Sequence, residues 1–133
     1  MAEKTTYGIK RKVKLSYEDA ILKVTETLKM EGFGVLTEID VKQTLKKKLD
    51  KDFTKYIILG ACNPPIAFQA LTEEIEIGLL LPCNVIVYEE PDSKETIVAA
   101  IDPGTLIQVT QREDLSEVAE MVRGKLTRAI DNV

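Results

Sequence analysis

Alternating hydrophobic and polar positions mark two strands in the first part of the chain. In residues 7–15, Ile9, Val13 and Leu15 lie on one side with basic residues between them, a pattern that predicts a half-exposed strand. A second strand is predicted for residues 33–39. Helical spacing follows each of them, so we expect the chain to open as strand, helix, strand, helix.

The first helix is predicted to start after Ser16, which forms a capping pattern with Asp19, and to end at Gly32. Its apolar stripe consists of Tyr17, Ile21, Val24 and Leu28. A second capping pattern, Asp40 with Gln43, precedes a short lysine-rich helix.

The middle of the chain contains a continuous apolar run at residues 56–61, which is short enough to predict a buried central strand. Pro64 is then expected to begin a helix, because the first helical turn tolerates proline. Gly78 is the expected end of this helix.

Two β-branched runs, residues 85–90 and 95–101, flank a short turn and predict an antiparallel hairpin. Asp114 with Glu117 is expected to cap a final helix. We therefore expect a single α+β domain over residues 1–133. In this compact layer domain, a mixed sheet with a C-terminal antiparallel hairpin would pack against about four helices.

The composition is typical of a globular protein without a membrane span. The chain has 133 residues, of which 44% are hydrophobic and 30% charged. Its longest apolar run, residues 75–87, contains Glu76 and Pro82 and falls short of the ~20 residues that a membrane helix needs. The first residues carry no apolar secretory signal. The sequence thus predicts a cytoplasmic protein without a membrane partner, whose two cysteines are kept reduced.

Charge is divided unevenly along the chain. Residues 1–55 carry 13 basic and 9 acidic side chains, whereas residues 56–133 carry 5 basic and 13 acidic ones. The most basic stretch holds six lysines between Lys42 and Lys55, but two aspartates interrupt it and aromatic residues are sparse. We interpret it as a solvated helix face and expect no nucleic-acid partner.

Histidine is absent from the sequence, which excludes histidine-based triads and histidine metal ligands. Any catalysis would have to use thiol, carboxylate, lysine, tyrosine or backbone groups. No pattern in the sequence indicates a cofactor or assigns a catalytic residue, and the question of enzymatic activity stays open at this point.

The chain's two cysteines each precede an asparagine, and both pairs lie at expected junctions between strand and loop. Cys62 is followed by Asn63, and Cys83 by Asn84. These four residues are our candidate ligand-binding residues.

Local packing explains much of the first pair. Because Pro64 and Pro65 have no N–H group, the amide of Ile66 is the one left for an Asn63 side-chain cap. The two prolines also remove donors that would stabilise a thiolate, and no histidine can deprotonate it. We therefore expect an ordinary or raised pKa for the Cys62 thiol.

Three arrangements of the four residues remain open. If their strands adjoin, the two thiols would form a disulfide or a two-thiolate metal site, for which zinc needs two further ligands. Alternatively, Asn63 and Asn84 would be paired amide donors in a small polar pocket of an otherwise apolar wall. In the third arrangement, both amides simply bond their own backbone and both cysteines pack in the core.

Residues 56–88 resemble the family known as domain of unknown function 302, through a Leu-Gly-Ala-Cys-Asn-Pro-Pro core and a Gly-Leu-Leu-Leu-Pro-Cys-Asn segment. The Ala-Ala-Ile-Asp-Pro segment at residues 99–103 is similar to that family too, and the likeness covers nearly the whole chain. The resemblance implies an α+β domain that packs as a homodimer, and it brings no established activity. The positions that coincide with the family pattern are Cys62, Asn63, Pro64, Cys83, Asn84, Asp102 and Pro103.

These observations lead to three hypotheses about function. The first is a homodimeric binding module whose pocket, built around the two Cys-Asn pairs, accepts a small molecule or a metal. The second is a thiol-dependent redox or transfer enzyme, with Cys62 as nucleophile and Cys83 as resolving thiol. The third is a protein-interaction domain that uses the basic N-terminal half against an acidic surface. Residues 77–81, which are apolar and surplus to a single core, favour a homodimer.

Overall fold

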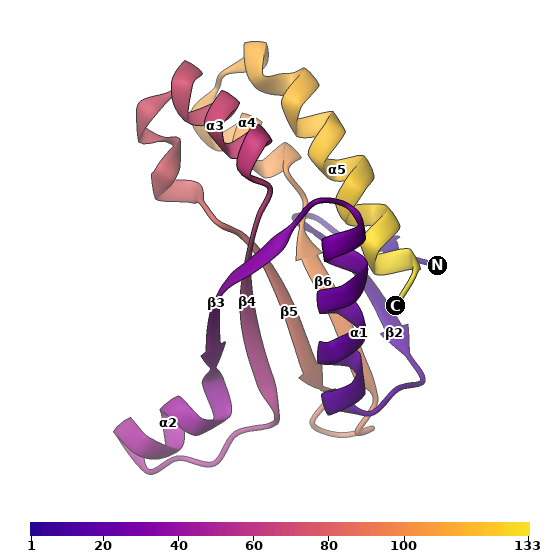
Figure 1. Ribbon diagram of the computed structural model, residues 1–133. Helices are drawn as coiled ribbons and strands as arrows, with labels where there is room; N and C mark the ends of the chain where they lie inside the picture. The colour runs from indigo at the N-terminus through magenta and orange to yellow at the C-terminus, as the bar shows by residue number, and fades with distance from the viewer.

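A six-stranded sheet forms the centre of the computed structural model, which describes residues 1–133 (Figure 1). The strands are β1 (Glu3–Lys4), β2 (Gly8–Val13), β3 (Gly34–Asp40), β4 (Tyr56–Cys62), β5 (Cys83–Glu89) and β6 (Thr96–Ile101). Their order is β1-β2-β6-β5-β4-β3. The expected α+β class and the hairpin, formed by β5 and β6, are confirmed.

Every neighbouring pair in this sheet is antiparallel, so the sheet is not the mixed one that was expected. The reason is the course of the connections in Figure 1. The helix between β3 and β4 lies at one end of the sheet, and the helix between β4 and β5 at the other. Because neither connection crosses a face of the sheet, each following strand runs back in the opposite direction.

Two long helices cover one face of the sheet (Figure 1), which we call the covered face. They are α1 (Tyr17–Met30) and α5 (Ser116–Asp131). With the strands beneath them they form a cluster of 19 buried hydrophobic residues. Leu28 of α1, Leu126 of α5 and Leu59 of β4 are fully buried in it. This cluster is the hydrophobic core.

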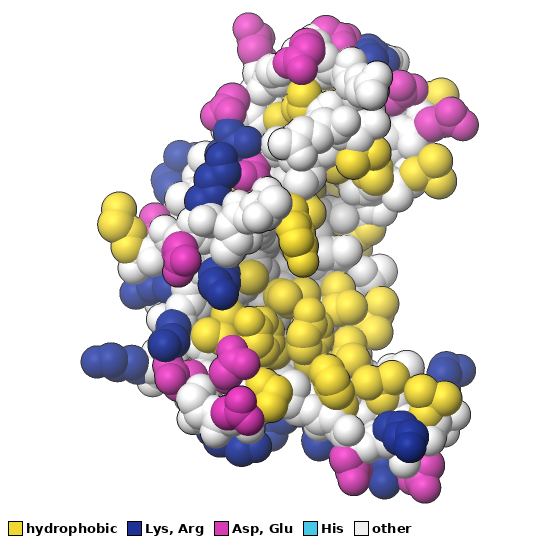
Figure 2. Space-filling model, turned by 180° about the vertical axis from the view of Figure 1, so that it is seen from behind, with side chains coloured by type: hydrophobic (Ala, Val, Ile, Leu, Met, Phe, Trp, Pro, Cys, Tyr) yellow, Lys and Arg dark blue, Asp and Glu magenta, His cyan; other side chains and the backbone are white.

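The opposite face carries no helix, and we call it the open face. Its apolar residues occupy alternate positions of the inner strands. Ile97 is buried there, and the others are only half-buried: Tyr56, Ile58, Ile86, Tyr88, Ala99 and Ile101. Figure 2 shows apolar side chains gathered over the middle of this face. The run at residues 56–61 was expected to be buried on both sides, but in the structure β4 is an inner strand covered on one side only.

Two of the predicted helix caps are confirmed. The Ser16 hydroxyl accepts a hydrogen bond from the Asp19 amide at 3.0 Å, and Asp40 accepts one from the Gln43 amide at 2.9 Å. Gly32 follows α1 with a φ of 87°, a conformation that favours glycine. Asp40 caps α2 (Val41–Leu49), which stands out from the end of the sheet and has no buried residue (Figure 1).

The cap expected from Asn63 is wrong. Helix α3 (Pro64–Glu73) does begin at Pro64, yet the Asn63 side chain makes no capping hydrogen bond. Its amide nitrogen instead donates to the carbonyl oxygen of Glu31 at 3.4 Å, because the loop after α1 lies beside it. The helix also ends at Glu73 rather than Gly78, and a 3₁₀ helix, η1 (Ile75–Leu80), continues the chain.

The C-terminal third differs from expectation at two points. Helix α4 (Gly104–Thr110) was not predicted, and the 3₁₀ helix η2 (Glu113–Leu115) precedes α5. The predicted Asp114 cap is wrong, since both carboxylate oxygens of Asp114 accept hydrogen bonds from Arg112, at 2.8 and 2.7 Å. None of the helices combines the length and the apolar character that crossing a bilayer requires.

Candidate functional site

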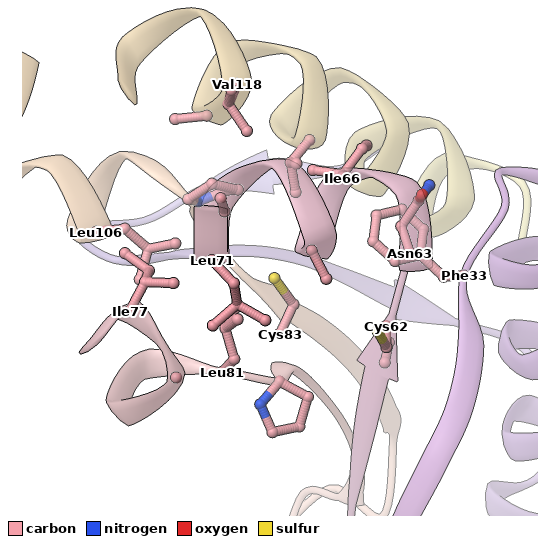
Figure 3. A pocket seen from close by; sticks show the side chains of 18 of the residues that line it. Phe33, Cys62, Asn63, Ile66, Leu71, Ile77, Leu81, Cys83, Leu106 and Val118 are labelled. Atoms are coloured by element: carbon pink, nitrogen blue, oxygen red, sulfur yellow. The ribbon is translucent and has the colours of Figure 1, made fainter. Parts of the chain in front are cut away.

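A cavity of about 370 Å³ lies beyond the ends of β4 and β5, between α3, η1, α4 and α5 (Figure 3). Its wall is apolar: 17 of the 22 lining residues are hydrophobic and none is charged. Because Cys62 and Cys83 both line it, we call it the thiol cavity. Its volume lies in the range of small-molecule pockets, roughly 300 to 1,000 Å³.

The two cysteines reach this cavity because β4 and β5 are neighbours. Ala61 pairs with Cys83, so Cys62 and Cys83 lie at the same end of adjacent strands. Both are free thiols, Cys62 half-buried and Cys83 buried. Burial, and to a lesser degree the nearby Cys62, raises the pKa of the Cys83 thiol to about 11. Cys83 is therefore a neutral thiol at physiological pH.

The structure brings three of the four candidate residues together and separates the fourth. Cys62, Asn63 and Cys83 line the thiol cavity (Figure 3). Asn84 follows Cys83 within a strand, so its side chain lies on the other side of the sheet, exposed beside the open face. The two amides therefore do not share a pocket.

A metal site would need more ligands than the cavity supplies. The chain contains no group of three or more cysteine, histidine, aspartate or glutamate side chains that could hold a metal ion. Two thiols alone leave half of a tetrahedral zinc site unfilled. The chemistry that the wall supports is the burial of apolar surface.

Helix α3 and η1 form the roof of the cavity, and Ile66, Leu71 and Ile77 are directed into it (Figure 3). No residue of α3 is buried, so this part of the roof is loosely packed, whereas Ile77 of η1 is buried. One ion pair connects the roof to the rest of the chain: Glu74, between α3 and η1, lies with a carboxylate oxygen 3.1 Å from Nη1 of Arg112. Sequence reasoning missed these roof residues, because their short apolar spacing resembles that of an ordinary core helix.

Gly60 allows two residues of the cavity wall to pack closely against the backbone of β4. A Cβ atom at this position would collide with the side chains of Thr37 and Pro82, both of which line the cavity. The glycine of the Leu-Gly-Ala-Cys-Asn segment thus has a packing role, since Thr37 of β3 and Pro82, just before β5, approach the β4 backbone closely here.

Asp102 joins α4 to α5 beside the cavity. This nearly fully buried carboxylate accepts hydrogen bonds from the Gly104 amide and from Arg123 Nε, both at 2.9 Å, and lies 3.7 Å from the Lys4 ammonium. Burial alone would raise the pKa of Asp102, but the Gly104 amide and the Arg123 and Lys4 charges outweigh it and lower the pKa. Pro103, the next residue, lines the cavity, so this cluster fixes part of its wall.

Comparison with known proteins agrees with this fold. The family model described as domain of unknown function DUF302 matches residues 9–133. The chain is also similar to a crystal structure of an uncharacterized conserved DUF302 protein from Bacillus stearothermophilus. The two share 31% sequence identity with a TM-score of 0.89, over 96% of this chain and 98% of that one. A comparison with curated proteins finds no match. The chain therefore belongs to the DUF302 family.

Proposed function

We propose that this protein is a binding module that holds a small, predominantly apolar molecule in the thiol cavity. The observation that carries this proposal is the wall itself, a concave volume with 17 hydrophobic lining residues and no charge. Apolar pockets of this size with a few polar groups are the usual form of small-molecule sites. Cys62, Asn63 and Cys83 would contact the ligand, whereas Asn84 lies outside the cavity.

Two other sequence hypotheses for this site receive less support. A metal would find two thiols and no third ligand side chain nearby. A thiol-dependent enzyme would use Cys83 as its resolving thiol, but burial raises the pKa of Cys83 to about 11, and no histidine exists to act as a base for either cysteine. Burial of an apolar ligand requires neither a third metal ligand nor a thiolate.

A cavity-filling variant tests the proposal. Ala70 lies on α3 and lines the cavity, so Ala70→Trp would occupy the space that a ligand needs. We expect the wild-type protein to bind the neutral apolar dye Nile red with micromolar affinity, and Ala70→Trp to weaken that binding about tenfold or more. Dye fluorescence and calorimetry measure both values.

Ala99→Trp is the matched control, because it adds the same side chain to the open face, outside the cavity. It should bind the dye as the wild type does. If the wild type binds no apolar probe, or if Ala99→Trp abolishes binding while Ala70→Trp leaves it unchanged, the thiol cavity is not the ligand site.

A second feature supports homodimer formation, which is independent of the ligand. The open face is a broad apolar surface that continues onto the side of α2 facing it, with a hollow between α2 and the opposite end of the molecule (Figure 2). Tyr56 and Tyr88 stack there with ring centroids 5.4 Å apart, and Ile39 and Leu49 are 49% and 63% exposed. Contiguous exposed apolar surface of this kind is typical of protein interfaces.

Charge favours a second copy of the chain as the occupant of this face. Residues 41–55, around α2, carry six lysines and two aspartates, whereas Glu73, Glu74 and Glu76 lie at the other end of the molecule. A two-fold axis parallel to the open face, and at right angles to the line from α2 to the acidic end, would bring two open faces together. It would also place α2 of one protomer against the acidic end of its partner.

The oligomeric state tests this proposal. We expect light scattering to give about twice the chain mass of 14.9 kDa, and a dimer that weakens with salt. Ile86→Lys on the open face should yield a monomer, while Ala70→Trp in the cavity should not change the mass. A wild-type monomer at micromolar concentration would contradict it, because standard interfaces of roughly 1,600 Å² persist there.

A further inference from the structure

The thiol cavity offers no partner for an anionic ligand. The polar side chains among its lining residues are Thr37 and Asn63, and no lysine or arginine reaches it. The amide nitrogen of Asn63 is already directed to the carbonyl oxygen of Glu31. A carboxylate inside the cavity would therefore lose its hydration without gaining an ion pair, which is strongly unfavourable.

The chain around the cavity is acidic. Glu73 and Glu76 flank the roof residues Leu71 and Ile77, and Glu113, Asp114 and Glu117 flank Leu115 and Val118 in the facing wall. A ligand end that projects from the cavity on this side would enter a negative field, which repels anions and attracts cations.

The basic residues nearest the cavity are already paired with carboxylates. Arg123 is paired with Asp102 and Glu120, and Arg112 with Asp114 and Glu74. The Nε and Nη2 atoms of Arg112 donate to the two oxygens of Asp114 at 2.8 and 2.7 Å, and its Nη1 atom donates to Glu74 at 3.1 Å. Three of its five N–H donors are thus bonded to carboxylates, and two carboxylates balance its charge without a ligand. Glu74 and Asp114 thus neutralise the positive charge with which Arg112 could otherwise pair with the carboxylate of a fatty acid.

We propose that the thiol cavity selects neutral or cationic apolar molecules and rejects fatty acids and other apolar anions, and that the Arg112 pairs with Glu74 and Asp114 set this selectivity. The proposal rests on the binding function argued above and specifies the chemical class of its ligand. None of these three residues lines the cavity. They are specificity-determining residues that act through their charges, not through contact with the buried part of the ligand.

Three probes with the same alkyl chain test the selectivity: decanol, decyltrimethylammonium and decanoate, each titrated against bound Nile red. We expect decanoate to bind about tenfold or more weakly than decanol when its carboxyl group is ionised, and to approach decanol when acid protonates it. Decyltrimethylammonium should bind at least as tightly as decanol, with an advantage that decreases as salt is added.

The variant Glu74→Gln/Asp114→Asn releases Arg112 and should increase the affinity for ionised decanoate severalfold while leaving decanol binding unchanged. Glu73→Gln/Glu76→Gln is the matched control, because it removes as much negative charge without releasing Arg112. Circular dichroism checks that both variants fold.

The possible outcomes separate the two proposals. If ionised decanoate binds as tightly as decanol, or if the control raises decanoate affinity as much as the release of Arg112 does, the selectivity proposal is wrong while the binding function stands. If Nile red and all three probes fail to bind, both proposals fall.

Discussion

The two faces of the sheet are built from alternate residues of the same strands, yet they differ in what surrounds them. On the covered face, Leu59, Val85 and Val98 are fully buried beneath α1 and α5. On the open face, the neighbouring Ile58 and Ile86 are only half-buried. The side chains are chemically alike, so apolar character in a strand does not by itself identify the core.

The difference between the faces shows where stability and interaction are encoded. The covered face supplies the hydrophobic burial that folds the chain, since each apolar side chain there is removed from water within one molecule. Apolar residues on the open face contribute little of this until another surface covers them. Substitutions on adjacent residues can therefore measure the two roles separately.

The largest expected effect is a difference between neighbours in β4. Leu59→Ala should lower the free energy of unfolding by about 3 kcal/mol or more, because it leaves a void in the close-packed core. Ile58→Ala should cost roughly 1 kcal/mol in a dilute, monomeric sample. Urea denaturation measures both. Equal losses at low protein concentration would mean that the open face is as well packed as the covered one.

Asp102 tests how firmly the helices are held to the covered face. Asp102→Ala should destabilise the protein by about 2 to 3 kcal/mol, since it orphans the Gly104 amide and the partly buried Arg123. Because the folded pKa of Asp102 is lowered, its contribution is present above 3.8, the ordinary pKa, and is lost as pH falls further. Acid denaturation of the wild type and of Asp102→Asn should therefore differ, and coincident curves would contradict this.

Cys83, which is buried in the hydrophobic core, should make the free energy of unfolding depend on pH in the alkaline range. Its pKa rises from 9.0 in the unfolded chain to about 11 in the folded one, so the unfolded thiol ionises first. The free energy of unfolding should consequently fall as pH rises from 9 to 11, by about 2 kcal/mol from this group. Cys83→Ala should flatten that slope but retain the part due to Tyr17, whose pKa burial raises to about 12. An unchanged slope would show that Cys83 is accessible to water.

The smallest expected effect compares the helix caps. Ser16→Ala removes the hydrogen bond that caps α1 over the covered face, and should cost about 1 kcal/mol. Asn63 makes no such bond, so Asn63→Ala should cost less than about 0.5 kcal/mol. Thermal unfolding of the two variants checks the contrast. A loss at Asn63 as large as that at Ser16 would restore the cap that the sequence predicted.

Local chemistry made several elements predictable from the sequence. The Ser16 and Asp40 caps, the start of α3 at Pro64 and the β5–β6 hairpin depend on interactions within a few residues, and all are present. The two wrong caps failed because distant groups compete. The Glu31 carbonyl lies beside Asn63, and Arg112 takes the oxygens of Asp114.

The candidate site was predictable only in part, for similar reasons. Both cysteines were expected at strand ends, but the sequence left open whether the two strands adjoin, as β4 and β5 do. Strand alternation could already have placed Asn84 on the face opposite Cys83. The apolar roof and α4 were not foreseen, because periodicity does not say whether an apolar helix face meets a packed core or encloses a cavity. The uncovered face was equally hidden, since Tyr56 and Ile58 have the composition of buried strand residues.

The strand order also has a consequence for the folding pathway. Strands β3, β4, β5 and β6 pair in chain order, β3 with β4, β4 with β5 and β5 with β6, so they can form by local steps. By contrast, β2 pairs with β6, and Gly8 lies opposite Ile101. This pairing closes a loop that spans most of the chain, which makes it entropically costly and slow. The seam between β2 and β6 is therefore expected to close last, and the amides of β4 and β5 should gain protection from hydrogen exchange before those of β2.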